Sequence, residues 1–175
     1  LDSEEKNTIL EHLIKGAEYY IAEENIGEHG LCKIRGGDWL DAVNGAGLEG
    51  RGESVTVSAQ MVMGMKYLSD ILTKLDPAAD VKRYLDMAEF FKENLNKYAF
   101  NKAGYYNGVF SDNGEWIFSE ADPDGEKRMY GVANYYSIIA GVADEEKTAS
   151  ILENAEFLKC DMGYKLFWPY LGAKP

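Results

Sequence analysis

The chain has 175 residues, of which 46% are apolar and 13% aromatic, and it carries a formal net charge of −12. This length and composition fit a single globular region, residues 1–175, that can bury a hydrophobic core. The negative charge argues against nucleic acid and anionic membrane surfaces as partners, because both attract basic proteins, but it leaves neutral substrates such as sugars open.

Residues near the N-terminus follow the pattern of an amphipathic helix. Apolar side chains recur at helical spacing from Ile9 to Ile21. Ser3 followed by Glu5 is typical of a helix start. The sequence therefore predicts a helix over about residues 4–22.

A long glycine-rich stretch, residues 30–54, follows this helix. Loops of this length inside compact domains are usually functional or disordered. Disorder is disfavoured here, because side chains such as Leu31, Trp39 and Val43 are too apolar for a solvated linker. We interpret the stretch as an ordered active-site loop that the rest of the chain supports.

Two helices are expected after this stretch. Ser54 is typical of a helix start, and an apolar stripe extends over residues 55–72. Asp76-Pro77 then places an N-cap residue before a proline, which predicts a third helix over about 77–98.

After residue 100 the hydrophobic period changes, and residues 105–118 predict a small β-hairpin around Asn113-Gly114. The further expected elements are a turn over 122–125, helices over about 127–140 and 145–156, and an irregular aromatic tail over 160–175. The fold class is therefore mostly α. Helices paired through loops fit a helical toroid or solenoid.

Asp38 and Asp41 flank Trp39 within the glycine-rich stretch. Two nearby carboxyl groups can perform acid–base chemistry on a glycosidic bond, and the indole face offers a surface for a sugar ring. The alternative is that both aspartates only cap turns, as Asp often does in glycine-rich loops. The spacing alone leaves both interpretations open.

Other candidate groups carry weaker signals. Arg51 precedes a helix N-terminus, where free N–H groups favour anions, but the sequence does not match a Walker loop. The alternatives are that Glu53 or Ser54 caps this helix, or that Arg51 pairs with an acid of the loop. His12 and His29 lie in no metal-binding pattern, so no metal is expected.

The cellular location is inferred from weak signals. Cys32 and Cys160 match no metal spacing and predict free thiols in a reducing compartment. The uncharged run over residues 55–65 is too short to cross a bilayer, and residues 1–5 do not show the pattern of a signal peptide. A cytoplasmic location is therefore expected.

Three blocks of the chain resemble one protein family. Residues 30–55 read G-L-x-x-I-x-G-G-D-W-x-D-x-x-N-x-x-G-x-x-G-x-G-E-S-V, which resembles the cellobiose and chitobiose phosphorylases of glycoside hydrolase family 94. Residues 131–146 are similar to the family's Gln-x-Trp-x-x-x-x-Gly-x-Ala-Asp-Glu-Glu segment, and 162–170 to the segment that follows. The first block is the most specific of the three.

The resemblance implies an (α/α)6 barrel that cleaves a β-glycosidic bond with inorganic phosphate, inverts the anomeric centre and releases a sugar 1-phosphate. It implies that Asp41 is the general acid, that Trp39 helps to form the subsite for the transferred ring, and that Asp38 is a supporting residue. The implied partners are a β-linked di- or oligosaccharide and inorganic phosphate, without an organic cofactor or a metal, and a homodimer is common in the family.

One acid is enough for such a reaction, because phosphate is already an anionic nucleophile, whereas an inverting hydrolase needs a second carboxylate to activate water. Asp41 must then be protonated, which requires burial or a neighbouring negative charge. Asp38 or bound phosphate are the expected sources of that charge.

The chain departs from the family pattern at three positions: Leu40 stands in place of Asn, Asn134 in place of Gln, and Tyr136 in place of Trp. The downstream Glu-Asn-Gly segment and the phosphate-binding His and Thr-Gly residues of the family are also not found. We therefore expect an incomplete piece of a larger catalytic domain that is inactive by itself. The rival interpretations are an inverting hydrolase on a related barrel and a non-catalytic carbohydrate-binding domain.

Overall fold

A computed structural model describes residues 6–172 of the chain. Its first helix, α1 (Ile9–Ile21), begins after Thr8, whose side chain forms a reciprocal capping box with Glu11. The start predicted at Ser3 lies outside the described residues. Residues 6–8 are not helical, so the helix is shorter than the predicted one.

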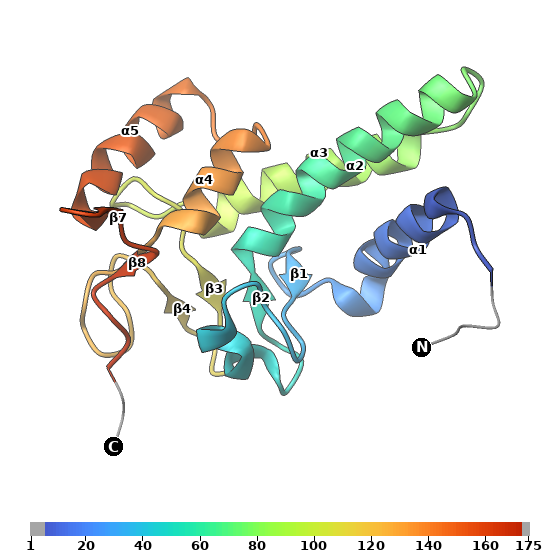
Figure 1. Cartoon of the computed structure of the whole chain (residues 1–175). Coiled ribbons are helices and arrows are strands. Elements are labelled where there is room, and N and C mark those ends of the chain that lie inside the picture. The colour runs from blue at the N-terminus through green and yellow to red at the C-terminus, as the bar shows by residue number, and fades with distance from the viewer. Residues whose placement is uncertain (1–5, 173–175) are drawn as a thin grey trace.

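The longest helix, α2 (Val55–Leu75), lies at the centre of the fold. It begins where the sequence predicts, because the Ser54 hydroxyl accepts a hydrogen bond from the Val57 N–H group. It packs against α1, α3 (Lys82–Asn94) and α4 (Gly131–Ile139). Figure 1 shows α2 and α3 running side by side away from the rest of the molecule.

The prediction for the start of the third helix is wrong. Asp76 ends α2 as its C-cap, and the Asp76 carboxylate accepts a hydrogen bond from the Ala78 N–H group. The chain turns there, and α3 begins at Lys82 instead of Pro77. After α3 the chain continues as a π-helical segment, η3 (Leu95–Ala99).

A four-stranded antiparallel sheet joins both ends of the glycine-rich stretch to the predicted hairpin. Its order is β1 (Cys32–Lys33), β2 (Glu53–Ser54), β3 (Val109–Phe110) and β4 (Trp116–Ile117). The hairpin β3–β4 is confirmed, with Gly114 at a φ of +81° in its turn. The pairing with β1 and β2 was not predicted, because two-residue strands show no hydrophobic period.

The glycine-rich stretch contains regular structure and is therefore not one continuous irregular loop. Besides β1 and β2, it forms the 3-10 helix η2 (Asp41–Gly47), which appears in Figure 1 as the cyan coil below the sheet. Buried Ile34, Leu40 and Val43 attach this part of the chain to the hydrophobic core. The apolar residues of this stretch therefore pack in the core, as expected for an ordered segment and not for a solvated linker.

The segment before α4 also differs from the prediction. The helix begins at Gly131 and not near Lys127, because β5 (Met129–Tyr130) pairs with β8 (Phe167–Trp168). The aromatic tail is thereby fixed to the body of the protein. The expected turn at 122–125 is confirmed by a hydrogen bond of 2.7 Å from the Gly125 N–H group to the Asp122 carbonyl.

The fifth helix, α5 (Glu145–Ala155), matches its predicted range closely. The Asp144 side chain caps it by accepting a hydrogen bond of 2.8 Å from the Lys147 N–H group. The remaining elements are the 3-10 helices η1 (Glu23–Asn25) and η4 (Glu156–Leu158) and the hairpin of β6 (Lys159–Cys160) and β7 (Gly163–Tyr164).

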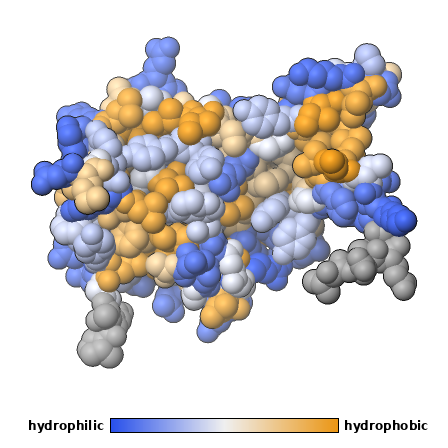
Figure 2. All heavy atoms as spheres, viewed as in Figure 1, coloured by the Kyte–Doolittle hydropathy of each residue, from blue (hydrophilic) through white to orange (hydrophobic). Residues whose placement is uncertain are grey.

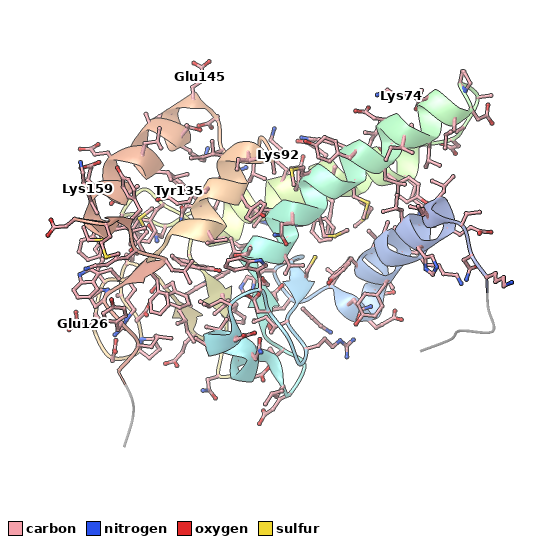
Figure 3. All side chains as sticks on the ribbon, viewed as in Figure 1. Lys74, Lys92, Glu126, Tyr135, Glu145 and Lys159 are labelled. Carbon is pink, nitrogen blue, oxygen red and sulfur yellow. The ribbon has the colours of Figure 1, made fainter. Side chains whose placement is uncertain are left out.

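The hydrophobic core lies between α2, α3, α4 and the sheet, and its largest fully buried side chains include Phe91, Tyr106 and Tyr130. Figure 3 shows side chains filling the space between α4 and α5. Apolar side chains also reach the surface over α1 and the adjoining end of α2 (Figure 2), where Leu13 and Tyr67 are exposed. None of the helices within residues 6–172 combines the length and apolarity needed to span a bilayer.

Asn134 of α4 joins that helix to the chain before β3. Its side-chain oxygen accepts a hydrogen bond of 2.7 Å from the Tyr106 N–H group. Its side-chain nitrogen donates to the carbonyl oxygens of Tyr106 and Tyr130, at 3.0 and 2.9 Å. Because Asn134 is fully buried, water does not reach these backbone groups, and the Asn134 side chain is their partner instead.

We expect Asn134→Ala to lower the free energy of unfolding by at least about 2 kcal/mol, because each buried polar group left without a partner costs about 1–3 kcal/mol. Urea denaturation of the protein and its variant measures this change. Ser137→Ala is the matched control on α4, because the Ser137 hydroxyl is also buried but only donates to the Ala133 carbonyl within the helix. Equal losses in the two variants would contradict this role for Asn134.

Candidate active site

The first end of the glycine-rich stretch is held by the buried carboxylate of Glu53 on β2. It accepts hydrogen bonds of 3.1 Å from the N–H groups of His29 and Leu31 and contacts the His29 ring nitrogen Nδ1 at 2.5 Å. Burial raises the pKa of Glu53, and these hydrogen bonds offset the effect only in part. A Cβ at Gly27 would collide with this carboxylate, so glycine is required there.

The other end of the stretch is held by Asp112 in the turn of the hairpin β3–β4. Its carboxylate accepts hydrogen bonds from the N–H groups of Glu49, Arg51 and Gly52, at 2.7, 2.9 and 2.9 Å. Burial opposes ionisation of Asp112, but the three N–H donors outweigh it and lower its pKa. Sequence reasoning missed this role, because nothing in the turn sequence indicates a contact so far along the chain.

Arg51 forms an ion pair and Ser54 caps a helix, which are the structural alternatives to an anion-binding site. The Arg51 guanidinium forms an ion pair of 2.9 Å with Glu28, just before the glycine-rich stretch, and lies over the Phe110 ring at 5.1 Å. The pair is half exposed and therefore contributes little stability. Ser54 caps α2, as one of the alternatives predicted.

Asp38 shapes the turn that carries the candidate catalytic residues. Its N–H group donates to the Asn44 side-chain oxygen at 2.7 Å, and its own Oδ1 accepts from the Leu40 N–H group at 3.0 Å. The Leu40 side chain is buried in the core. Asp38 therefore caps the turn, as the alternative interpretation predicts for it.

The same turn presents Trp39 and Asp41 on the outside of the protein. The Trp39 side chain is 56% exposed. Asp41 is exposed at the first position of η2 and makes no hydrogen bond or ion pair with any residue in the described part of the chain. The structure thus brings the three predicted residues together on one turn. The burial expected for Asp41 is not provided by residues 6–172.

Three buried polar atoms near the candidate site have no hydrogen-bond partner among the described residues: Oδ2 of Asp38, Oγ1 of Thr56 and the hydroxyl oxygen of Tyr130. Thr56 lies in the first turn of α2 and Tyr130 directly before α4. Burial raises the pKa of Tyr130, and the Asp38 charge raises it further. The turn of Asp38 therefore adjoins a polar interior that sequence reasoning did not find.

A hollow of about 510 Å³ lies beside η2. One wall is formed by residues 42–49 and another by the hairpin residues 111–117. Three acidic residues, Glu49, Asp112 and Glu115, line it, together with Ser111, Asn113 and several small or apolar residues. Asp38, Trp39 and Asp41 are not among its lining residues, but the hollow offers space for a ligand of the size of a sugar unit beside the 3-10 helix that Asp41 begins.

The two histidines lie apart from this turn. His12 is on α1 beside an apolar surface groove, and His29 contacts the rings of Tyr98, Phe110 and Trp116. Across residues 6–172, no three His, Cys, Asp or Glu side chains are grouped so that they could hold a metal ion. Both cysteines are free thiols, Cys32 buried and Cys160 exposed.

A mostly helical fold with an aspartate–tryptophan–aspartate turn on a glycine-rich stretch is consistent with a carbohydrate-active enzyme. Residues 1–173 match the model of the glycosyl hydrolase 94 superfamily, catalytic domain. The chain therefore belongs to this family. The resemblance seen in the sequence is confirmed.

Several curated relatives are phosphorylases. The chain is 28% identical to a 3-O-β-D-glucopyranosyl-β-D-glucuronide phosphorylase of Paenibacillus borealis, over 95% of this chain and 21% of the relative. It is 26% identical to a solabiose phosphorylase of the same organism, over 83% of this chain and 18% of the relative. It is 26% identical to an N,N'-diacetylchitobiose phosphorylase of Vibrio proteolyticus, over 80% and 17%. The chain thus spans about a fifth of the length of these relatives.

We expect Asp112 to make stability depend on pH in acid. Its pKa in the folded protein is lowered, so its contribution is fully present above the unfolded pKa of about 3.9 and is lost as the pH falls through the folded value. In Asp112→Ala the thermal midpoint should be lower at pH 7 and should fall less steeply below about pH 4.

The matched control for this measurement is Asp161→Ala, because Asp161 is an exposed aspartate in the turn between β6 and β7. Thermal midpoints of the three proteins across the acid range compare the slopes. Parallel curves for the wild type and Asp112→Ala would contradict the anchoring role.

Proposed function

We propose that the protein to which this chain belongs cleaves a β-glycosidic bond with inorganic phosphate, inverts the anomeric centre and releases a sugar 1-phosphate. The proposal is supported chiefly by membership of the glycosyl hydrolase 94 superfamily together with relatives that are phosphorylases. Phosphate is a co-substrate in this reaction, and the proposal includes no organic cofactor and no metal.

In the proposed mechanism a phosphate oxygen attacks the anomeric carbon while the bond from that carbon to the leaving oxygen breaks. Asp41 donates its proton to the leaving oxygen. Trp39 supports the sugar ring with its exposed indole face, and Asp38 fixes the turn through its bonds to Leu40 and Asn44. Only one carboxyl group is required, because the nucleophile is already an anion.

The exposed position of Asp41 places a condition on this mechanism. A carboxyl group stays protonated near neutral pH only when it is buried or lies beside a negative charge. We propose that bound phosphate and residues outside this chain provide these surroundings, as parts of a complete (α/α)6 barrel. This fits a chain that spans about a fifth of its relatives.

The three departures from the family pattern differ in their consequences. Leu40 is buried in the core, and Asn134 uses its amide group on backbone partners, so neither is placed to recognise a sugar. Tyr136 is half-buried on α4. We therefore propose that substrate preference depends on Trp39 and on the hollow beside η2 more than on these positions.

Two free thiols among the described residues support a cytoplasmic location, and a homodimer is proposed from the family resemblance. The rival functions are hydrolysis, which would proceed without phosphate, and sugar binding without turnover. The assay of Asp41→Asn, carried out with and without phosphate, distinguishes both functions from phosphorolysis.

We expect Asp41→Asn in the whole protein to lower phosphorolysis by about 10²–10⁴-fold, the usual contribution of a positioned acid. Release of sugar 1-phosphate from β-linked disaccharides, with and without phosphate, is the measurement. Asp70→Asn is the control, because Asp70 is exposed on α2 away from the turn. Near-normal turnover in Asp41→Asn would exclude Asp41 as the acid, and phosphate-independent cleavage would select a hydrolase.

We expect Trp39→Ala to raise KM several-fold, because an aromatic contact is worth about 0.5–1.5 kcal/mol beyond the area that it buries. Trp39→Phe, which keeps a ring, should recover most of the affinity. The thermal midpoint should not change in either variant, because Trp39 is more than half exposed. Unchanged KM in Trp39→Ala would remove this residue from the substrate site.

A further inference from the structure

A second hollow, of about 320 Å³, lies between the hairpin β3–β4 and the chain on either side of it. It is built of an aromatic ring, two amides, a hydroxyl and two carboxylates, from the side chains of Trp116, Asn101, Asn107, Ser119, Glu115 and Glu120. Of these side chains, Glu115 alone also lines the hollow beside η2 that the proposed function uses. Such a mixture of one aromatic ring and several polar groups is typical of a ligand site.

Asn107 carries an unused hydrogen-bond donor in this hollow. The residue as a whole is only 5% exposed, and its side-chain oxygen accepts a hydrogen bond of 2.8 Å from the Asn101 amide. The amide nitrogen of Asn107 makes no hydrogen bond with any residue from 6 to 172. This nitrogen is not one of the buried atoms without a partner, so it is open to the hollow and available to donate to an acceptor on a ligand.

The carboxylates add acceptors next to this donor. One oxygen of Glu120 accepts a hydrogen bond of 2.9 Å from the Ala103 N–H group, and the other has no partner in the described chain. Glu115 is exposed at the rim. Lys, Arg and His are absent from the described lining, so the hollow repels anions such as phosphate. Hydroxyl groups, which both donate and accept, match this set.

Trp116 gives the hollow a rigid apolar wall. Its ring packs against Phe110 and His29, with centroid separations of 5.2 and 5.3 Å, and these contacts fix its orientation. A ring held in this way offers an apolar surface to the C–H groups of a sugar without loss of side-chain freedom on binding.

We propose that this hollow binds one neutral pyranose unit, with the sugar against Trp116 and its hydroxyl groups bonded to Asn107 and Glu120. Glu115 and Pro123 also line the hollow beside η2, so the two hollows adjoin. The hollow is therefore a further sugar site that adjoins the hollow beside η2. It does not require Asp41 to be a catalytic acid.

The test uses the whole protein labelled with 5-fluorotryptophan and titrated with methyl β-D-glucopyranoside. The ¹⁹F resonance that is missing from Trp116→Phe belongs to Trp116, and Trp168→Phe identifies a control resonance outside the hollow in the same way. We expect the Trp116 resonance to shift saturably while that of Trp168 does not. No saturable shift at Trp116 would overturn the proposal.

Two variants test the polar contacts. Asn107→Asp keeps the oxygen that accepts from Asn101 and removes the donor, and we expect binding about tenfold weaker. Glu120→Gln keeps an acceptor for the Ala103 N–H group and removes the charge, and we expect a several-fold loss. If Asn107→Asp shows no thermal unfolding transition and is therefore not folded, the affinity of Glu120→Gln decides the test. Unchanged affinity in the folded variants would overturn the assignment.

Two further measurements separate this site from its rivals. Methyl β-D-glucuronide should bind more weakly than the glucoside, because the carboxylates of the hollow repel it. Equal or tighter binding would exclude a neutral sugar as the ligand. In Asp41→Asn the Trp116 shift should persist even when phosphorolysis is lost, so failure of the proposed reaction leaves this inference intact. Loss of the shift in Asp41→Asn would show that the two sites are one.

Discussion

Two carboxylates, those of Glu53 and Asp112, hold the glycine-rich stretch, and the geometry of the candidate site depends on them. Each accepts backbone N–H groups that glycine-rich chain leaves without partners of its own. Glu53 closes the stretch at the sheet, and Asp112 closes it from the hairpin turn. Between these two points the buried side chains of Ile34, Leu40 and Val43 hold the chain against the core, and the turn of Trp39 and Asp41 lies among them.

Local signals predicted the parts of the fold that local interactions determine. Ser54 and Asp144 cap their helices as expected, because an N-cap needs only the next turn of chain. Asp76 shows the limit of such signals, since the same side chain can cap a helix or, as here, close a turn after one. The four-stranded sheet could not be predicted, because its two-residue strands are defined by partners distant in sequence.

The sequence predicted that Asp38, Trp39 and Asp41 lie close together, but it did not predict their surroundings. The Asp-Trp-x-Asp spacing places Asp38, Trp39 and Asp41 on one turn, and the family match confirms that the resemblance was correct. Spacing does not reveal that Asp38 bonds to the Leu40 backbone or that Asp41 is exposed. Exposure depends on which other parts of a protein cover a residue, and that information lies outside a local motif.

The way in which the turn is held has an evolutionary consequence. Its shape is maintained by main-chain groups and by an inward-facing aliphatic side chain at position 40, while the indole of Trp39 faces outward. The atoms that hold the turn are thus separate from the side chain that it exposes. Selection can therefore replace the outward-facing side chain at position 39 with little penalty in folding.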